Sequence, residues 1–302
     1  MSAAVPPVLS GELSLGRRLA GFVALTKPRI IELLLVTTLP TMVVAARGVP
    51  SWTLMAATLF GGMLAAGGAN AINMFVDRDI DAVMRRTRGR PLVTGVISPA
   101  AALTFAVALE VLAFVELWVA VNRLSALLAL SATLFYVFVY TLWLKRTSRQ
   151  NIVIGGAAGA VPVLVGWAAV RDTVGWAPVV LFLLMFVWTP PHFWALAIKY
   201  REDYRSAQVP MMPVVTTFKR TAAQILGYSV LVAAVSLVFG WTAGMGPLYW
   251  VSAALLGAVF CGLAVQLWRE PTEMRAMRLF HWSITYVAAL FGAMAVDQLL
   301  FH

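Results

Sequence analysis

The sequence predicts an all-α polytopic membrane protein with about nine transmembrane helices in one bundle. Of its 302 residues, 61% are hydrophobic and 12% are charged, whereas a soluble domain is about 45–50% apolar and about 25% charged. One core cannot hide this much apolar surface, because surface area grows too fast with chain length. Lipid must therefore solvate much of the surface, which excludes disorder, a disulfide scaffold and most soluble enzymes.

Nine apolar runs are long enough to cross a bilayer, which takes roughly 20 residues per helix. The first run begins at about residue 27, and Pro28 suits the first turn of a helix. The sixth contains Pro190 and Pro191, and we expect this pair to kink or break the helix and free backbone carbonyls. The predicted spans are 27–46, 52–74, 98–119, 123–144, 151–170, 176–198, 222–242, 247–268 and 279–300.

The basic residues predict how the bundle is oriented. With nine spans, the amino terminus and the connections after even-numbered spans share one side. All but three of the 23 Lys and Arg residues lie there, the exceptions being Arg47, Arg123 and Arg171. The positive-inside rule then places the amino terminus in the cytoplasm and the carboxyl terminus outside. The net charge of +10 thus indicates basic loops that face anionic lipid and the cell interior, with no nucleic-acid partner.

Neither a linker nor a low-complexity tract divides the chain. We expect a single intramembrane domain over residues 1–302, with residues 1–19 as a flexible cytoplasmic tail. The amino terminus lacks the apolar core of a signal peptide. The one cysteine, Cys261, lies in an apolar run, so neither an intrachain disulfide nor a zinc site is expected.

The end of the second span carries the strongest chemical signal. Asn73, Asp77 and Asp81 are four residues apart, so on a continuous helix they stack on one face over about 12 Å, at about 1.5 Å per residue. We call these three side chains the oxygen ladder. Mg²⁺ prefers oxygen ligands and bridges to phosphates, and the arginines that follow, including Arg86 and Arg90, are fork-shaped phosphate ligands. The alternative is a solvated helix end with interspersed charges.

A second polar segment lies at the cytoplasmic end of the sixth span. His192 follows the proline pair, and an ionisable residue inside the membrane suggests function. The alternative is a histidine that is hydrogen-bonded between helices. Lys199 and Asp203 are four residues apart and could pair on a helix, or Asp203 could serve a metal or a phosphate.

Further charged residues open or end other spans. Lys27 and Arg29 open the first span and Lys145 ends the fourth. Each alone suits an anchor at the membrane surface, but together they surround the oxygen ladder with the cations that a diphosphate bound to Mg²⁺ needs. Glu110 and Glu116 lie within the third span, where a neutral, hydrogen-bonded carboxyl is expected.

A diphosphate site beside an apolar bundle favours an isoprenoid diphosphate over a soluble phosphate substrate. The prenyl tail would lie in the bundle, and metal and cations would stabilise the leaving diphosphate. An allylic cation would then form in a water-poor cavity, where an acceptor captures it.

The oxygen ladder and the arginines after it resemble the first aspartate-rich motif of the UbiA-type intramembrane prenyltransferase superfamily, which includes the 4-hydroxybenzoate polyprenyltransferases. Three other segments resemble the branch of that superfamily that farnesylates protohaem IX: Thr26–Arg29, Thr189–Trp194 and Lys199–Tyr204. The resemblance extends over about residues 20–300 and implies the same nine-helix layout.

The resemblance implies a reaction and its setting. A farnesyl group would pass from farnesyl diphosphate to a vinyl group of haem B, with addition of water, to give haem O for terminal oxidase biogenesis. Mg²⁺ is the implied cofactor, and haem B is a substrate. The implied location is the cell membrane of a bacterium, as a multi-pass protein in the lipid bilayer with the active site facing the cytoplasm. A haem A synthase or a terminal oxidase assembly protein is the implied partner.

The resemblance also implies roles for single residues. The metal ligands would be Asn73, Asp77 and Asp81, and the catalytic residues would be Asp77, Asp81, Lys199 and Asp203. The substrate-binding residues would be Lys27, Arg29, Arg86, Arg90, Lys145, His192 and Tyr204, with His192 touching the haem as axial ligand or propionate partner. Many members of the superfamily carry a second pair of acids four residues apart. Here Glu202 and Asp203 are adjacent, which leaves a second two-carboxylate metal site open.

Two other functions remain open on the sequence. One is a different membrane prenyltransferase, acting on a quinone precursor or chlorophyllide. The other is a cation-coupled transporter that uses Asp77, Asp79 and Asp81. Transporter sites usually lie near the bilayer midplane, whereas this cluster lies at one surface among arginines.

Overall fold

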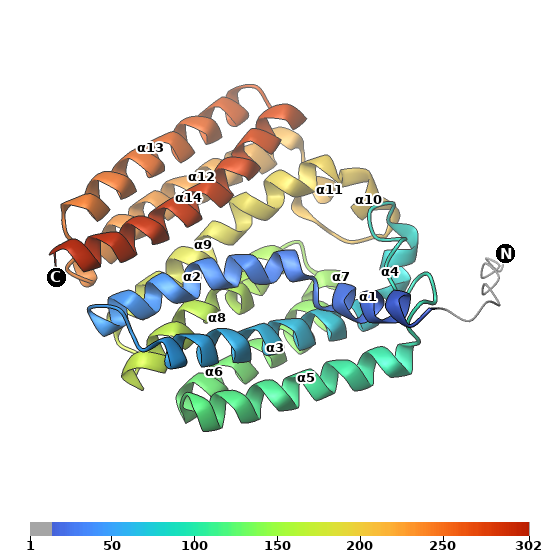
Figure 1. Cartoon of the computed structure of the whole chain (residues 1–302). Helices are drawn as coiled ribbons and strands as arrows, with labels where there is room; N and C mark the ends of the chain where they lie inside the picture. Colours follow the sequence, from blue (N-terminus) through green and yellow to red (C-terminus); the bar gives the residue numbers. More distant parts are fainter. Residues whose placement is uncertain (1–13, 302) are drawn as a thin grey trace.

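The computed structural model describes residues 14–301 as a bundle of long helices, with no strand in that part of the chain (Figure 1). Eight of the described helices are long and apolar enough to cross a membrane, and a ninth, α2, lies at the first predicted span. The spanning segments are α2 (Pro28–Ala46), α3 (Trp52–Val76), α5 (Pro99–Ala120), α6 (Arg123–Leu134) continued by the π-helix η1 (Phe135–Leu144), α8 (Asn151–Arg171), α9 (Trp176–Lys199), α12 (Phe218–Thr242), α13 (Pro247–Arg269) and α14 (Glu273–Phe301). The predicted fold class is confirmed.

Five short helices lie toward one end of the bundle (Figure 1). They are α1 (Leu15–Thr26), α4 (Arg78–Val83), α7 (Lys145–Thr147), α10 (Arg201–Ser206) and α11 (Met212–Val215). Residues 15–19, expected in the amino-terminal tail, form the start of α1, because the Ser14 side chain caps the helix by accepting a hydrogen bond from the backbone N–H of Arg17.

Side-chain caps fix where several spans begin. Ser51, Ser98, Asn122 and Thr217 each precede a helix and accept a hydrogen bond from a backbone N–H of its first turn. Such caps satisfy donors that would otherwise be unpaired near lipid. The first and last spans also meet, since α2 packs against α14. Helix α2 packs against α8 as well.

Helices α3 and α5 pack closely through glycine. A Cβ atom at Gly68 would lie 2.6 Å from Glu110 Oε1 and 3.0 Å from the carbonyl oxygen of Ala106, so only glycine fits. Glu110 also accepts a hydrogen bond from Thr133 Oγ1 (3.3 Å), as expected for a carboxyl in a span. Glu116 differs, because its Oε2 is buried with no hydrogen-bond partner among the described residues.

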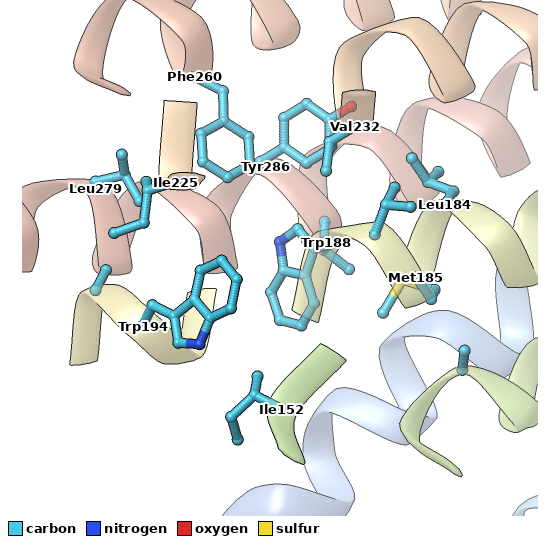
Figure 2. Packing of buried hydrophobic residues seen from close by; sticks show 14 of the residues in the cluster. Ile152, Leu184, Met185, Trp188, Trp194, Ile225, Val232, Phe260, Leu279 and Tyr286 are labelled. Atoms are coloured by element: carbon cyan, nitrogen blue, oxygen red, sulfur yellow. The ribbon is translucent and has the colours of Figure 1, made fainter. Parts of the chain in front are cut away.

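The largest core forms where α9 packs against α8, α12 and α14. Figure 2 shows Trp188 and Trp194 of α9 among Ile225, Phe260 and Tyr286 from the neighbouring helices. The indole N–H of Trp188 donates to the carbonyl oxygen of Ser283 at 2.9 Å, which ties α9 to α14.

Of the kink or break expected at Pro190 and Pro191, the break is wrong, because α9 is helical through both residues. Both prolines are buried, with helices packed against α9 on several sides. Neighbouring helices therefore hold the segment in a helical path that local sequence disfavours.

A buried carboxylate closes the opposite end of the bundle. Asp297 of α14 is fully buried, and its two oxygens accept from the backbone N–H groups of Gly246 (2.6 Å) and Tyr249 (3.0 Å). Both N–H groups lie at the start of α13. Asp297, a residue of α14, therefore caps the amino terminus of α13. The sequence analysis did not predict this role, because a single Asp in an apolar run gives no sign of which distant backbone groups it will bind.

Candidate active site

The oxygen ladder lies where α3 meets α4, at the end of the bundle that carries the short helices (Figure 1). Asp77 ends α3, yet the backbone N–H of Asp77 donates to the Asn73 carbonyl (2.9 Å) and that of Asp81 to the Asp77 carbonyl (2.8 Å). The four-residue register therefore continues across the junction. Asn73 Nδ2 donates to Asp77 Oδ2 at 2.7 Å, and all three side chains of the ladder are buried.

Two cations form hydrogen-bonded ion pairs with the carboxylates of the ladder. Lys145 Nζ, from α7, forms a hydrogen-bonded ion pair with Asp77 Oδ2. Arg90, from the connection after α4, pairs with Asp81 Oδ2 at 2.5 Å. The structure thus brings together acids and bases that lie as many as 68 residues apart in the chain.

Lys27 is held at the corner between α1 and α2. Its backbone is left-handed (φ 53°, ψ 64°), a conformation that non-glycine residues rarely adopt. Asn70 Nδ2 donates to the carbonyl oxygen of Thr26 (3.1 Å), and Lys27 Nζ donates to Asn73 Oδ1 (2.8 Å). Burial and nearby positive charges lower the pKa of Lys27 to about 7. The Arg29 side chain lies outside the described residues.

The connection after α4 links the ladder to α10. Thr87 Oγ1 donates to the carbonyl oxygen of Asp81 (3.0 Å), which orders this connection. The guanidinium of Arg86 donates to the Tyr204 hydroxyl (2.8 Å), and its backbone N–H donates to Asp203 Oδ2 (3.3 Å). Burial raises the pKa of Tyr204, so it remains a neutral phenol. Arg86, Asp203 and Tyr204 therefore form one group beside the ladder.

Asp79 pairs with another cation and is not part of this group. Both of its oxygens accept from the Arg146 guanidinium at 2.7 Å, and the Asp79 side chain is 62% exposed. Hydrogen bonding to Arg146 lowers the pKa of Asp79 to about 2 from 3.8. The pair therefore contributes stability above about pH 4 that is lost as the pH falls through about 2, and the contribution is small because the pair is exposed.

The ladder fits a magnesium ion by its chemistry. Asp77 Oδ1 is buried with no hydrogen-bond partner among the described residues, and the nearest recorded cation is Arg146 at 3.7 Å. No group of three or more His, Cys, Asp or Glu side chains in the described part could share one ion. The available set is two carboxylates and one amide, which suits Mg²⁺ because this ion keeps several waters.

Lys199 does not join the ladder in this structure. Its side chain is exposed, with Nζ 5.8 Å from the centre of the Tyr200 ring. Tyr200 ends α9 and the chain turns before α10, so Lys199 and Asp203 do not share one helix. The expected alternative of an ion pair between them is absent from the described contacts.

His192 lies in the core between α9 and α14 and makes no recorded contact with the ladder within residues 14–301. Its ring stacks on Trp188 (4.3 Å between centroids) and Phe280 (4.7 Å). His192 Nδ1 lies 2.7 Å from Ser283 Oγ, and that hydroxyl donates to the Phe280 carbonyl. With the hydroxyl hydrogen on the Phe280 carbonyl, the complementary tautomer of His192 has its proton on Nδ1 and its lone pair on Nε2.

The π-helix η1 brings three further side chains to the site that sequence reasoning missed. Thr141 Oγ1 accepts from Asn73 Nδ2 at 3.1 Å. The rings of Tyr136 and Tyr140 stack at 5.4 Å, and both phenols lie within electrostatic reach of Asp77. Short π-helical segments often occur at functional sites, but the sequence shows only aromatic residues in an apolar run, which is equally typical of packing.

Known proteins resemble the chain over nearly its whole length. The model of the UbiA prenyltransferase family matches residues 34–285. A protein from Streptomyces avermitilis named protoheme IX farnesyltransferase is 52% identical over 296 residues, which is 96% of this chain and 97% of that protein.

Two solved structures share the fold. One, from work on digeranylgeranylglyceryl phosphate synthase, has a TM-score of 0.77 at 18% identity and covers 93% of this chain and 98% of its own. The other, a UbiA homolog from Archaeoglobus fulgidus bound to GPP and Mg²⁺, has a TM-score of 0.61 at 16% identity and covers 91% of this chain and 99% of its own. The family match over most of the chain, on a shared helical bundle, shows that this multi-pass membrane protein belongs to the UbiA prenyltransferase family.

Proposed function

We propose that the enzyme transfers the farnesyl group of farnesyl diphosphate to a vinyl group of haem B, with addition of water, to give haem O and diphosphate. The observation that carries this proposal is the buried oxygen ladder with its cations at one end of an apolar bundle. The acceptor is proposed from the name of the Streptomyces relative, which is about half identical along the chain.

The ladder and its cations form the proposed donor site. Asn73, Asp77 and Asp81 would hold Mg²⁺, which when bound supplies Lewis-acid neutralisation of the diphosphate charge. Lys145 and Arg90 now pair with the two carboxylates, so both are positioned to bind diphosphate oxygens. The Archaeoglobus homolog bound to GPP and Mg²⁺ supports this assignment.

The proposed reaction separates charge in a site that excludes water. The bond between the first farnesyl carbon and the diphosphate oxygen breaks, and the diphosphate leaves with the electron pair. The vinyl group of haem attacks the allylic cation, water adds to the resulting carbocation, and a proton is released. Lysine and arginine stabilise the leaving anion, while the stacked rings of Tyr136 and Tyr140 offer aromatic faces to the cation.

His192 is the proposed contact with haem iron. Its protonated Nδ1 is held by Ser283, as in metal sites where a second hydrogen bond orients a ligating histidine. Nε2 then has the free electron pair that iron needs. Lys199, Arg29 and Asp203 remain proposed substrate or catalytic residues.

The setting follows from the charge pattern and the proposed product. The site would face the cytoplasm of a bacterial cell from the plasma membrane, because the basic connections lie at that end. A haem A synthase or a terminal oxidase assembly protein is the proposed recipient of haem O.

The test is a product assay on the purified chain in nanodiscs. Haem B, farnesyl diphosphate and Mg²⁺ should yield a haem heavier by one farnesyl group and one water in mass spectrometry. A quinone precursor or chlorophyllide replaces haem B in parallel reactions. Product from one of these acceptors alone, or cation flux without any product, contradicts the proposal.

A further inference from the structure

A second basic site lies at the same end of the bundle, apart from the ladder. A surface pocket of about 410 Å³ opens between the connection before α8, the start of α10 and the start of α12. Its polar lining consists of Arg149, Arg201, Arg220, Thr216 and Thr217, with two valines as an apolar wall. We call this the basic pocket.

The arginines of the basic pocket have no partners of their own. Within residues 14–301, Arg149, Arg201 and Arg220 form no recorded ion pair or side-chain hydrogen bond, and Arg201 Nε is buried without an acceptor. A buried donor is costly unless something accepts from it. By contrast, Arg86 and Arg90 beside the ladder both have side-chain acceptors.

The start of α12 adds to the positive potential. Thr217 caps this 25-residue helix by accepting from the backbone N–H of Arg220 (3.2 Å), so the positive end of the helix dipole meets the pocket. No carboxylate lines the pocket in the described part of the chain. The nearby Glu202 is paired with Arg205 at 2.7 Å. The pocket therefore suits an anion with several oxygens.

We infer that the basic pocket binds the carboxylates of the acceptor, the two propionates of haem. This inference rests on the proposed function, whose two substrates are both anionic: a diphosphate and a dicarboxylate. The ladder supplies cations for the first, and the pocket uses a separate set for the second. Arg201 lies two residues from Asp203, which bonds to the Arg86 backbone, so the two sites are adjacent. Arginine forks match carboxylates, and they equally match a lipid phosphate or free phosphate.

The experiment combines charge-neutral variants with a neutral acceptor. Arg201→Gln, Arg220→Gln and the double variant are assayed in nanodiscs of zwitterionic lipid. Lys219→Gln is the matched control, because Lys219 is exposed on the same turn of α12 but does not line the pocket. The acceptors are haem B and its dimethyl ester, whose carboxylates carry no charge.

The double variant should raise the KM for haem B by about tenfold or more, the usual effect of losing hydrogen bonds to a charged group. The KM for farnesyl diphosphate should stay unchanged, as should every constant of Lys219→Gln. The unsubstituted enzyme should have a similarly raised KM for the dimethyl ester. The double variant should not raise the KM for the ester any further.

Other results would overturn the inference. Equal losses with haem B and its ester would show that the carboxylates bind elsewhere. A loss that appears only when anionic lipid is added, or one that inorganic phosphate reproduces by competition, would assign the pocket to those anions. A spectral titration of haem B binding to the enzyme and the double variant tests the pocket without turnover, so absence of product would count against the proposed function alone.

Discussion

Each carboxylate of the ladder holds a cation that the proposed reaction needs for the diphosphate. Asp77 holds Lys145 and Asp81 holds Arg90, with every partner at least partly buried. Buried ion pairs cost much when one partner is removed, since the other is left uncompensated. Removing either partner of a pair should therefore affect both folding and substrate binding.

Asp77→Ala should lower kcat by roughly 10²–10³-fold or more, because it removes a central oxygen of the ladder and the partner of Lys145. Product mass spectrometry measures this, and a chelator should have the same effect on the unchanged enzyme. Asp79→Ala is the control, since its exposed pair with Arg146 should cost less than about fivefold. Full activity of Asp77→Ala or in chelator would refute the metal assignment.

His192→Ala should change the absorption spectrum of bound haem while the KM for farnesyl diphosphate stays constant. Ser283→Ala keeps the imidazole but removes its hydrogen bond, and should weaken haem binding about 10- to 100-fold. Both variants are compared by spectrum, donor KM and melting temperature. A lower melting temperature with an unaltered spectrum would assign His192 a structural role only.

At the scale of single residues, the sequence predicted the features that depend on the spacing of neighbouring residues. The four-residue interval of Asn73, Asp77 and Asp81 indicated one face of a helix, and the structure keeps that register. The sequence also predicted Lys27 among the cations around the ladder, but not the hydrogen bond from Lys27 to Asn73, because 46 residues separate them and a left-handed corner makes the contact. Nor could it place Thr141 beside Asn73, since nothing in an apolar run marks the π-helical segment that carries Thr141.

At the scale of elements, the length of the apolar runs predicted the spans well. The proline pair in the sixth run, by contrast, wrongly suggested a break in the helix. Pro190 and Pro191 remain within α9 because the surrounding helices bury that segment. The same dominance of packing appears between α3 and α5, where glycine permits close approach. Contacts between helices thus override local propensity at both places.

Gly68→Ala should lower the free energy of unfolding by about 1–3 kcal/mol, because its methyl group would overlap Glu110 and the Ala106 carbonyl. Gly62 lies on the same helix with nothing within 4 Å of its ideal Cβ. Gly62→Ala should therefore be neutral or stabilise by up to about 1 kcal/mol. Thermal unfolding in detergent compares the two, and equal melting temperatures would show that α3 and α5 can separate without cost.

At the scale of the whole molecule, the placement of charge predicts orientation. The connections with most of the Lys and Arg residues end at the site, and the opposite end carries few. The site should therefore face the cytoplasm. The one native cysteine, Cys261, makes this convenient to test, since its removal leaves a background without thiols.

In a Cys261→Ser background, Thr173→Cys should react with a membrane-impermeant thiol reagent in intact bacterial cells. Ser206→Cys, exposed near the site, should react only after the cells are permeabilised. Mass shifts on gels report both reactions. The reverse pattern would place the site outside the cell and contradict the proposed topology.

The Asp297 cap has a consequence for biosynthesis. Until α14 is in place, two backbone N–H groups at the start of α13 have no acceptor near the membrane surface, and such donors are costly in lipid. The helix made earlier thus depends on a residue that the ribosome adds about fifty positions later. We therefore expect α13 to insert stably into the bilayer only together with α14, as a helical hairpin. Insertion of this last hairpin would then complete the folding of the bundle.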